Sequence, residues 1–383
     1  AAPTIGADGM LFFTLLLALP LAAQDPAGAP KPRLELADSA RRGAAPVRVD
    51  TGVSGVKRML RTSFVRNQTL LGIGLYAPSF AVAVTDEAVP AMAAYLVMAG
   101  GSFLAAAELS RDLRMTEGME LLATRAPLRG AAIGAALQYA LTGKNDYAAG
   151  IFAGSILGTT GALTLGKRLT PGAAMSSMFG ADAAAVLAVA SMYALNTDTG
   201  RARARAAVGA GAAIVGMQLG AMYAAYAPYS VTVGDVQTLW TSSLIGVVAA
   251  GTAVTNGSPS TRTTTFTLIG GGLAGLVAGD RWLVRRYDHS HSEGVLVSIA
   301  AVAGALMGGG VAVLVGSSER FNAATAGLGA AGAVGGVALA EHWIGARPDA
   351  GRRLSQRVTF SPQSLALAAA RMPGTYSIVS YSF

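Results

Sequence analysis

Long stretches without a single charged side chain limit what this chain of 383 residues can fold into. Most of them approach the ~20 residues with which an α-helix crosses about 30 Å of hydrocarbon. A soluble helix of that length would carry a polar stripe with a period of 3.6 residues, and these stretches show almost none. They therefore predict helices that contact lipid. The ten stretches are 67–85, 88–107, 130–143, 147–166, 183–197, 206–227, 236–255, 263–279, 294–316 and 321–340.

This arrangement predicts an all-α fold, a polytopic transmembrane bundle of about ten helices rich in Gly and Ala. The composition agrees, because 52% of the residues are apolar and only 13% are charged, whereas soluble domains carry about 25% charged residues. The absence of Cys excludes disulfide scaffolds, thiolate metal sites and cysteine nucleophiles. We divide the chain into an export segment (1–23), a basic segment (24–66), a membrane domain (67–343) and a tail (344–383).

The net charge of +8 comes from 29 Lys and Arg that lie mostly between the apolar stretches. Nucleic-acid-binding proteins instead gather such residues in one patch. We therefore expect the lipid bilayer and its anionic headgroups as partners, and no nucleic acid. A homo-oligomer and a complex with another envelope protein both stay open.

The first two segments predict export. Met10 begins an apolar run that ends in small residues at Ala23, which resembles a secretory signal peptide, although no Lys or Arg precedes it. Residues 24–66 predict a flexible segment that ends in a short amphipathic helix on the headgroups. A cleaved signal places this segment outside the cell, whereas the excess of Lys and Arg on its side of the membrane places it inside. Both cannot hold for ten spans in an inner membrane, so either the signal is not used, or one stretch does not cross, or the protein lies in a membrane to which the rule on Lys and Arg does not apply.

Glycine recurs at every fourth position in two of the stretches, at Gly150, Gly154 and Gly158 and again at Gly271, Gly275 and Gly279. Such a series leaves one helix face bare, so that a neighbouring backbone can approach closely, as in the glycine zippers of membrane proteins. We predict helix packing at these residues, with a smooth pore-lining face as the alternative. Shorter pairs occur at Gly130/Gly134, Gly216/Gly220, Gly304/Gly308 and Gly332/Gly336.

A short motif, a hydroxyl residue followed two positions later by Gly, precedes four of the stretches. Its hydroxyl is suited to cap a helix N-terminus, and Pro171 then occupies a first helical position, where proline is tolerated. The intervals of 54, 62 and 60 residues match the length of a two-helix hairpin, so the sequence predicts hairpin repeats of one orientation. The four copies begin at Thr116, Thr170, Thr232 and Ser292.

A few polar residues lie in or at the ends of the stretches. Asp182 must face a wet cavity, pair with a cation or take up a proton at membrane depth. An ion or proton path through Asp182 is one hypothesis. The alternatives are an interfacial Asp in the first turns of a helix and an interhelical hydrogen bond that fixes the helix register. The remaining polar residues of this kind are Gln138, Gln218, Glu341 and His342.

Signatures of catalysis are nearly absent. The segment Gly161–Arg168 resembles a phosphate-binding loop but places Arg168 where Ser or Thr must bind Mg²⁺. The loop with Asp288, His289, His291 and Glu293 is a weak candidate for a metal site, and we favour a solvated loop that caps the next helix, which explains the same residues. With only three His in the chain, we expect no enzyme, no cofactor and no metal.

The tail predicts two short strands, one ending at Phe360 and one at 375–383, joined as a β-hairpin with Pro373-Gly374 as a turn. The last strand resembles the terminal strand of outer-membrane barrels, but the glycine-rich stretches do not alternate as barrel strands do. We expect a non-catalytic, structural or scaffolding protein of a bacterial-type cell envelope, in the inner rather than the outer membrane. The alternatives are a passive channel or transporter through Asp182 and an outer-membrane protein with a barrel-like last strand.

Overall fold

The charge-poor stretches form long helices in the computed structural model, which describes residues 52–195, 201–255, 259–315, 323–345, 359–360 and 379–380. The turns η1 (Gly72–Tyr76) and η4 (Asp280–Val284) are π-helical, and η2 (Gly166–Arg168) is a 3-10 turn. The helices are α2 (Gly52–Leu71), α3 (Ala77–Val84), α4 (Ala88–Asp112), α5 (Glu117–Thr142), α6 (Ala148–Leu165), α7 (Pro171–Leu195), α8 (Ala202–Tyr226), α9 (Val233–Thr255), α10 (Thr261–Gly279), α11 (His291–Val315) and α12 (Ala323–Gly345).

Among the described residues, seven helices are long and apolar enough to cross a membrane: α4, α6 together with η2, α7, α8, α9, α11 and α12. The prediction of an all-α membrane fold is confirmed to that extent. The predicted count of about ten spans is not, since α2, α5 and α10 carry too many charged or hydroxyl side chains for their length. α5, for example, includes Glu117, Glu120, Arg125 and Arg129.

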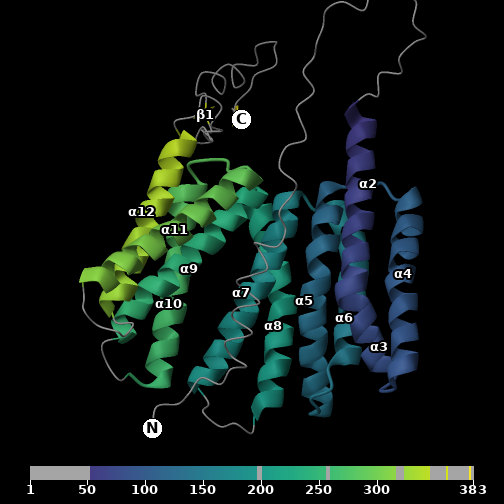
Figure 1. The fold of residues 1–383 in the computed structure, drawn as a ribbon. Helices are drawn as coiled ribbons and strands as arrows, with labels where there is room; N and C mark the ends of the chain where they lie inside the picture. The colour runs from purple at the N-terminus through teal and green to yellow at the C-terminus, as the bar shows by residue number, and fades with distance from the viewer. Residues whose placement is uncertain are drawn as a thin grey trace, which may run out of the picture. The chain divides into compact units, whose positions relative to one another are not determined.

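Consecutive helices pack as pairs along their lengths, α5 with α6, α7 with α8, α9 with α10 and α11 with α12 (Figure 1). The contacts between pairs follow one scheme, in which the first helix of a pair touches both helices of the next pair. Thus α5 contacts α7 and α8, α7 contacts α9 and α10, and α9 contacts α11 and α12. The helix α2 packs on α4 and α5, and α3 packs on α4 and α6.

The side chains are distributed as lipid solvation requires. Buried positions hold small or flexible residues such as Ala123, Ala174 and Met178, while large apolar side chains such as Leu104 on α4 and Leu306 on α11 are exposed. In lipid, helices associate through close packing of small residues, because hydrocarbon outside is as apolar as the interior. The exposed apolar surface therefore fits a bilayer and not water.

The helix α2 begins at Gly52, inside the segment 24–66 that the sequence predicts to be flexible. Its Phe64 is buried, Gln68 donates to the Ala123 carbonyl at 2.7 Å, and Ser63 donates to Glu120 at 2.6 Å. Residues 52–66 are therefore part of a helix that packs on α5, because their polar side chains find partners there. The signal-like segment 1–23 and residues 24–51 lie outside the described residues.

The described residues of the tail form two short strands. β1 (Thr359–Phe360) pairs with β2 (Val379–Ser380) in antiparallel fashion, with Thr359 opposite Ser380 and Phe360 opposite Val379. Residues 361–378 lie outside the described residues, so the predicted hairpin stays a prediction.

Candidate functional site

Backbone contact through glycine joins α5 to α6. A Cβ on Gly154 would overlap the carbonyl oxygen of Gly130, and one on Gly150 would overlap the carbonyl oxygen of Gly134. A Cβ on Gly158 would lie 2.6 Å from the carbonyl oxygen of Ala126. Only hydrogen on these carbons allows the two helices to lie this close.

The other three pairs meet in the same way. In the α9–α10 pair, a Cβ on Gly271 or Gly275 would overlap backbone or side-chain atoms of α9, and one on Gly279 would lie 2.6 Å from the Ser242 side chain. In the α7–α8 pair Gly180 faces Gly216, and in the α11–α12 pair Gly304 faces Gly332. The glycine faces thus lie inside the pairs, between helices adjacent in sequence.

The hydroxyl-x-Gly motifs lie where one pair meets the next. Thr116, Thr170 and Thr232 each accept a hydrogen bond from the backbone N–H three residues later, at 3.1–3.2 Å, which caps α5, α7 and α9. A Cβ on the glycine of each motif would overlap a backbone carbonyl oxygen in the loop before the next capped helix. The overlap is with Leu169 for Gly118, with Val231 for Gly172 and with Ser290 for Gly234.

The fourth motif caps at a different residue than the sequence suggests. Ser290, and not Ser292, accepts from the N–H of Glu293 at 3.4 Å, while Glu293 accepts from the N–H of Ser290 at 2.8 Å. This reciprocal pair is a capping box. Ser292 lies in the first turn of α11.

Asp182 of α7 pairs with Arg129 of α5. Arg129 Nε lies 2.9 Å from Oδ1 and 3.1 Å from Oδ2 of Asp182, and Nη2 lies 2.5 Å from Oδ2. The two side chains are only 15% and 12% exposed. Of the three states expected for a carboxylate at this depth, the structure shows the pairing with a cation. The bidentate geometry of this pair fixes the register of α5 against α7.

His289 occupies a fully buried site between three helices. Its Nδ1 lies 3.2 Å from Asp235 Oδ1 at the start of α9, and its Nε2 lies 2.8 Å from Glu341 Oε1 near the end of α12. The backbone also takes part, since Thr232 donates to the His289 carbonyl at 2.5 Å and the His289 N–H donates to Asp235 at 3.3 Å. One imidazole thus connects α9, α12 and the loop before α11.

Burial by itself lowers the pKa of His289. The hydrogen bonds and negative charges of Asp235 and Glu341 outweigh that effect and raise the pKa to about 9, from an ordinary value of 6.5. At neutral pH the imidazole is therefore charged, and both ring nitrogens donate. Glu341 Oε2 is buried and has no hydrogen-bond partner among the described residues.

The four residues of the metal-candidate loop do not converge. His289 points to Asp235 and Glu341, Glu293 caps α11, and Asp288 is exposed. Across the described residues, no group of three or more His, Asp or Glu has a geometry suited to a metal ion. The other polar candidates are dispersed: Gln138 accepts from the Gly150 N–H at the start of α6, whereas Gln218 and His342 are exposed.

A second polar cluster connects the end of α8 to η4. Tyr223 and Tyr229 both donate to Asp280 Oδ1, at 2.8 and 2.5 Å, and Arg285 Nε and Nη2 lie 2.9 and 2.7 Å from Oδ2. Burial acts to raise the pKa of Asp280, but the hydrogen bonds from Tyr229, Tyr223 and Arg285 lower it below its ordinary value. The carboxylate therefore stays ionised and holds the loop before α9 on η4.

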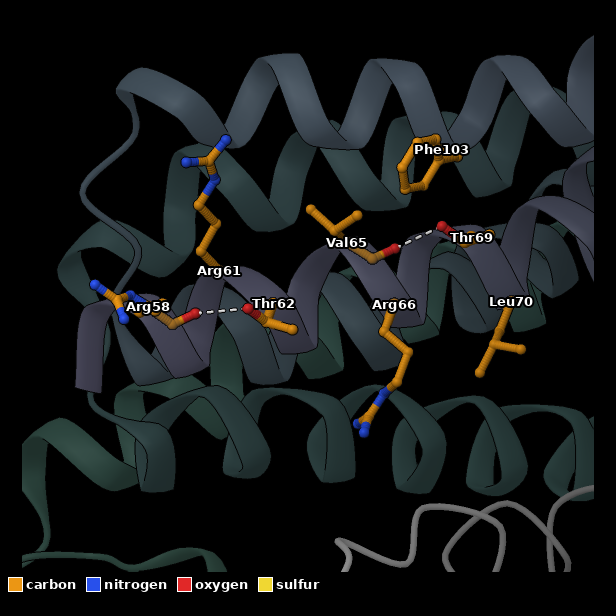
Figure 2. A pocket seen from close by; sticks show the side chains of 8 residues that line it. All are labelled: Arg58, Arg61, Thr62, Val65, Arg66, Thr69, Leu70 and Phe103. Atoms are coloured by element: carbon orange, nitrogen blue, oxygen red, sulfur yellow. Dashed lines mark hydrogen bonds between the residues drawn. The ribbon is translucent and has the colours of Figure 1, made fainter. Parts of the chain in front are cut away.

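A groove opens along α2 on the side of α4. It has a volume of about 530 Å³, and its lining combines three arginines with apolar and Thr side chains: Arg58, Arg61, Thr62, Val65, Arg66, Thr69, Leu70 and Phe103 (Figure 2). Arg61 reaches α4, where its Nε donates to Ser110 at 3.2 Å. A second cavity of about 350 Å³ shares Arg58 and Arg61 with it.

Comparison of the chain with family models, curated proteins and solved structures finds no match. Its function is therefore argued from its own residues. Sequence reasoning singled out Asp182, His289 and Glu341 but missed Asp235, although Thr232 followed three residues later by Asp235 is itself a capping signal. The partners of Asp182 and His289 come from helices far apart in sequence, and no local pattern identifies them.

Proposed function

We propose that this chain is a non-catalytic structural protein of the inner membrane of a bacterial-type cell envelope, and that its helix pairs are hairpin repeats. The observation that carries the proposal is how the buried polar groups are used. Arg129 and Asp182 satisfy one another between α5 and α7, and His289 bonds Asp235 and Glu341 between α9 and α12. These groups hold pairs of helices together.

The proposal of hairpin repeats rests on two sets of contacts. Each pair has its glycine face inside, and three successive motif glycines, Gly118, Gly172 and Gly234, meet the start of the following pair in the same way. Seven long apolar helices support an inner-membrane location, since outer-membrane proteins of bacteria cross their membrane as β-barrels. A scaffold of this kind is expected to associate with itself or with another envelope protein.

The transport alternative requires that Asp182 be accessible to an ion or proton. Both of its carboxylate oxygens instead accept hydrogen bonds from Arg129, which favours the structural role.

Flux measurements in liposomes test the choice. Purified protein is reconstituted into vesicles with an internal pH dye, and proton and K⁺ fluxes are compared with those of protein-free vesicles. A scaffold leaves both fluxes at the protein-free level. A flux in the wild type that Asp182→Asn abolishes would overturn the structural proposal, and recovery in the outer-membrane fraction would overturn the location.

A further inference from the structure

The groove along α2 has a charged end and an apolar end. Arg61 is level with Ser110 of α4, to which it is bonded. At a rise of 1.5 Å per residue, Phe103 lies about 10 Å further along α4 and Leu70 about 13 Å further along α2. Because Asp112 ends the membrane-length helix α4, Arg58 and Arg61 lie near the bilayer surface, Arg66 lies about 7 Å deeper than Arg61, and the apolar end lies deeper still.

The arginines of the groove have no acidic partner in the described part of the chain. Arg61 donates only to Ser110 and to the Ala107 carbonyl, and Arg66 donates to Asn67. None of the ion pairs among the described residues includes Arg58, Arg61 or Arg66. Three positive charges therefore line the groove without an ion pair to any described residue, and the nearest acidic residue of the adjoining cavity is Asp112.

The apolar lining continues from these charges. Val65 of α2 and Phe103 of α4 lie toward each other, and Arg61 extends toward α4 on the same side, whereas Arg66 extends from α2 in the opposite direction (Figure 2). Leu70 is 62% exposed, and Phe103 is 48% exposed, so apolar surface is available directly below the cationic groups. An amphipathic molecule with a negative head and a hydrocarbon tail matches both parts.

We propose that this groove is a specific site for one anionic glycerophospholipid, whose phosphate lies among Arg58, Arg61 and Arg66 and whose acyl chain lies along Val65, Leu70 and Phe103. Basic pockets between helices near a membrane surface bind anionic lipids in this way. The arginines donate several hydrogen bonds to phosphate oxygens. The inference rests on the membrane location proposed above.

The test measures lipid selectivity in reconstituted bilayers. The protein is placed in phosphatidylcholine bilayers with trace spin-labelled phosphatidylglycerol or phosphatidylcholine, and the motionally restricted fraction gives relative association constants. We expect the wild type to prefer phosphatidylglycerol, and R58Q/R61Q/R66Q to reduce that preference by about fivefold for each arginine that contacts the phosphate. Phe103→Ala is expected to weaken retention of the labelled lipid without loss of head-group selectivity.

A matched control distinguishes lipid binding in the groove from general electrostatic attraction of anionic lipids to the protein. K167Q/R168Q/R281Q removes three exposed positive charges outside the groove and is expected to keep the preference. An equal loss in both triple variants, or no preference in the wild type, would overturn the site while leaving the membrane location intact. Displacement of the lipid by millimolar inorganic phosphate would also overturn it, since a bare anion would then suffice; failure to enter bilayers at all would instead overturn the membrane location.

Discussion

Arg129 and Asp182 join α5 to α7, whereas His289 joins α9 to α12 through Asp235 and Glu341. The guanidinium of Arg129 stays charged at every accessible pH, so the cation of that contact is permanent. The imidazole of His289 loses its proton near pH 9, which leaves two carboxylates facing a neutral ring. Of two interfaces of the same kind, one therefore has a permanent cation and the other a cation that is lost in base; we call them the permanent and the titratable contact.

The largest expected effect comes from breaking the permanent contact on one side only. Asp182→Ala leaves the buried Arg129 without a counter-charge and is expected to cost about 3–5 kcal/mol in the free energy of unfolding. Denaturant unfolding in mild detergent measures it. The double variant R129M/D182L, which removes both charges, is expected to cost much less than either single change. A loss below about 1 kcal/mol for Asp182→Ala would contradict the role of the pair.

The titratable contact predicts a dependence of stability on pH. Because folding raises the pKa of His289 from 6.5 to about 9, the stability that its charge contributes is complete below pH 6.5. It is lost as the pH rises through 9, with a fall on the order of 1–3 kcal/mol. Unfolding between pH 6 and 10 measures this fall.

Two variants sharpen the pH experiment. His289→Gln is expected to flatten the profile in this range, since the neutral amide has no proton to lose. R129M/D182L is expected to keep the wild-type slope. A slope that survives His289→Gln would assign the pH dependence to another group.

The glycine contacts of the α5–α6 pair and of the α9–α10 pair can be tested in the same way. Gly154→Ala in α6 and Gly275→Ala in α10 each place a methyl group against a neighbouring backbone, 3.0 Å from the Cα of Gly134 or Gly246. Each is expected to destabilise the protein by about 1–2 kcal/mol through overpacking. Thermal unfolding in detergent measures both.

The same helices provide matched controls for the glycine variants. A Cβ on Gly161 of α6 or Gly270 of α10 meets nothing within 4 Å, so Gly161→Ala and Gly270→Ala are expected to be neutral or slightly stabilising. Equal effects at contact and control positions would mean that helix propensity, and not packing, decides the outcome.

The smallest effect concerns the cap beside His289. Ser290→Ala removes the acceptor for the Glu293 N–H and is expected to cost about 1 kcal/mol, whereas Ser292→Ala is expected to change almost nothing. A thermal shift assay on the two variants distinguishes them. A larger loss of stability for Ser292→Ala than for Ser290→Ala would show instead that Ser292 caps α11, as the spacing of the motifs predicts.

The sequence predicts those features that depend on residues close together in the chain. The charge-poor stretches predict the helices well, because hydropathy is local, and Thr116, Thr170 and Thr232 predict three caps through a contact only three residues long. The spacing of the motif glycines predicts the fourth cap at Ser292, whereas the capping box of Ser290 and Glu293 is the stronger local signal.

The polar contacts were harder to predict for a physical reason. The depth of Asp182 indicates that it needs a cation, but the choice of Arg129 depends on the relative register of α5 and α7. The sequence groups His289 with its neighbours as a metal candidate, whereas its partners Asp235 and Glu341 lie more than 50 residues away. Such pairings follow from tertiary packing, which a single sequence does not encode locally.

The placement of the glycine faces inside the pairs has a consequence for biosynthesis. Two helices that meet through their own bare backbones need only each other, so a hairpin can close as soon as its second segment has entered the bilayer. Contacts such as Arg129 with Asp182 must wait for the following hairpin to arrive. We therefore expect the contacts within a pair to form before those between pairs, with the pairing of Arg129 and Asp182 as a late step.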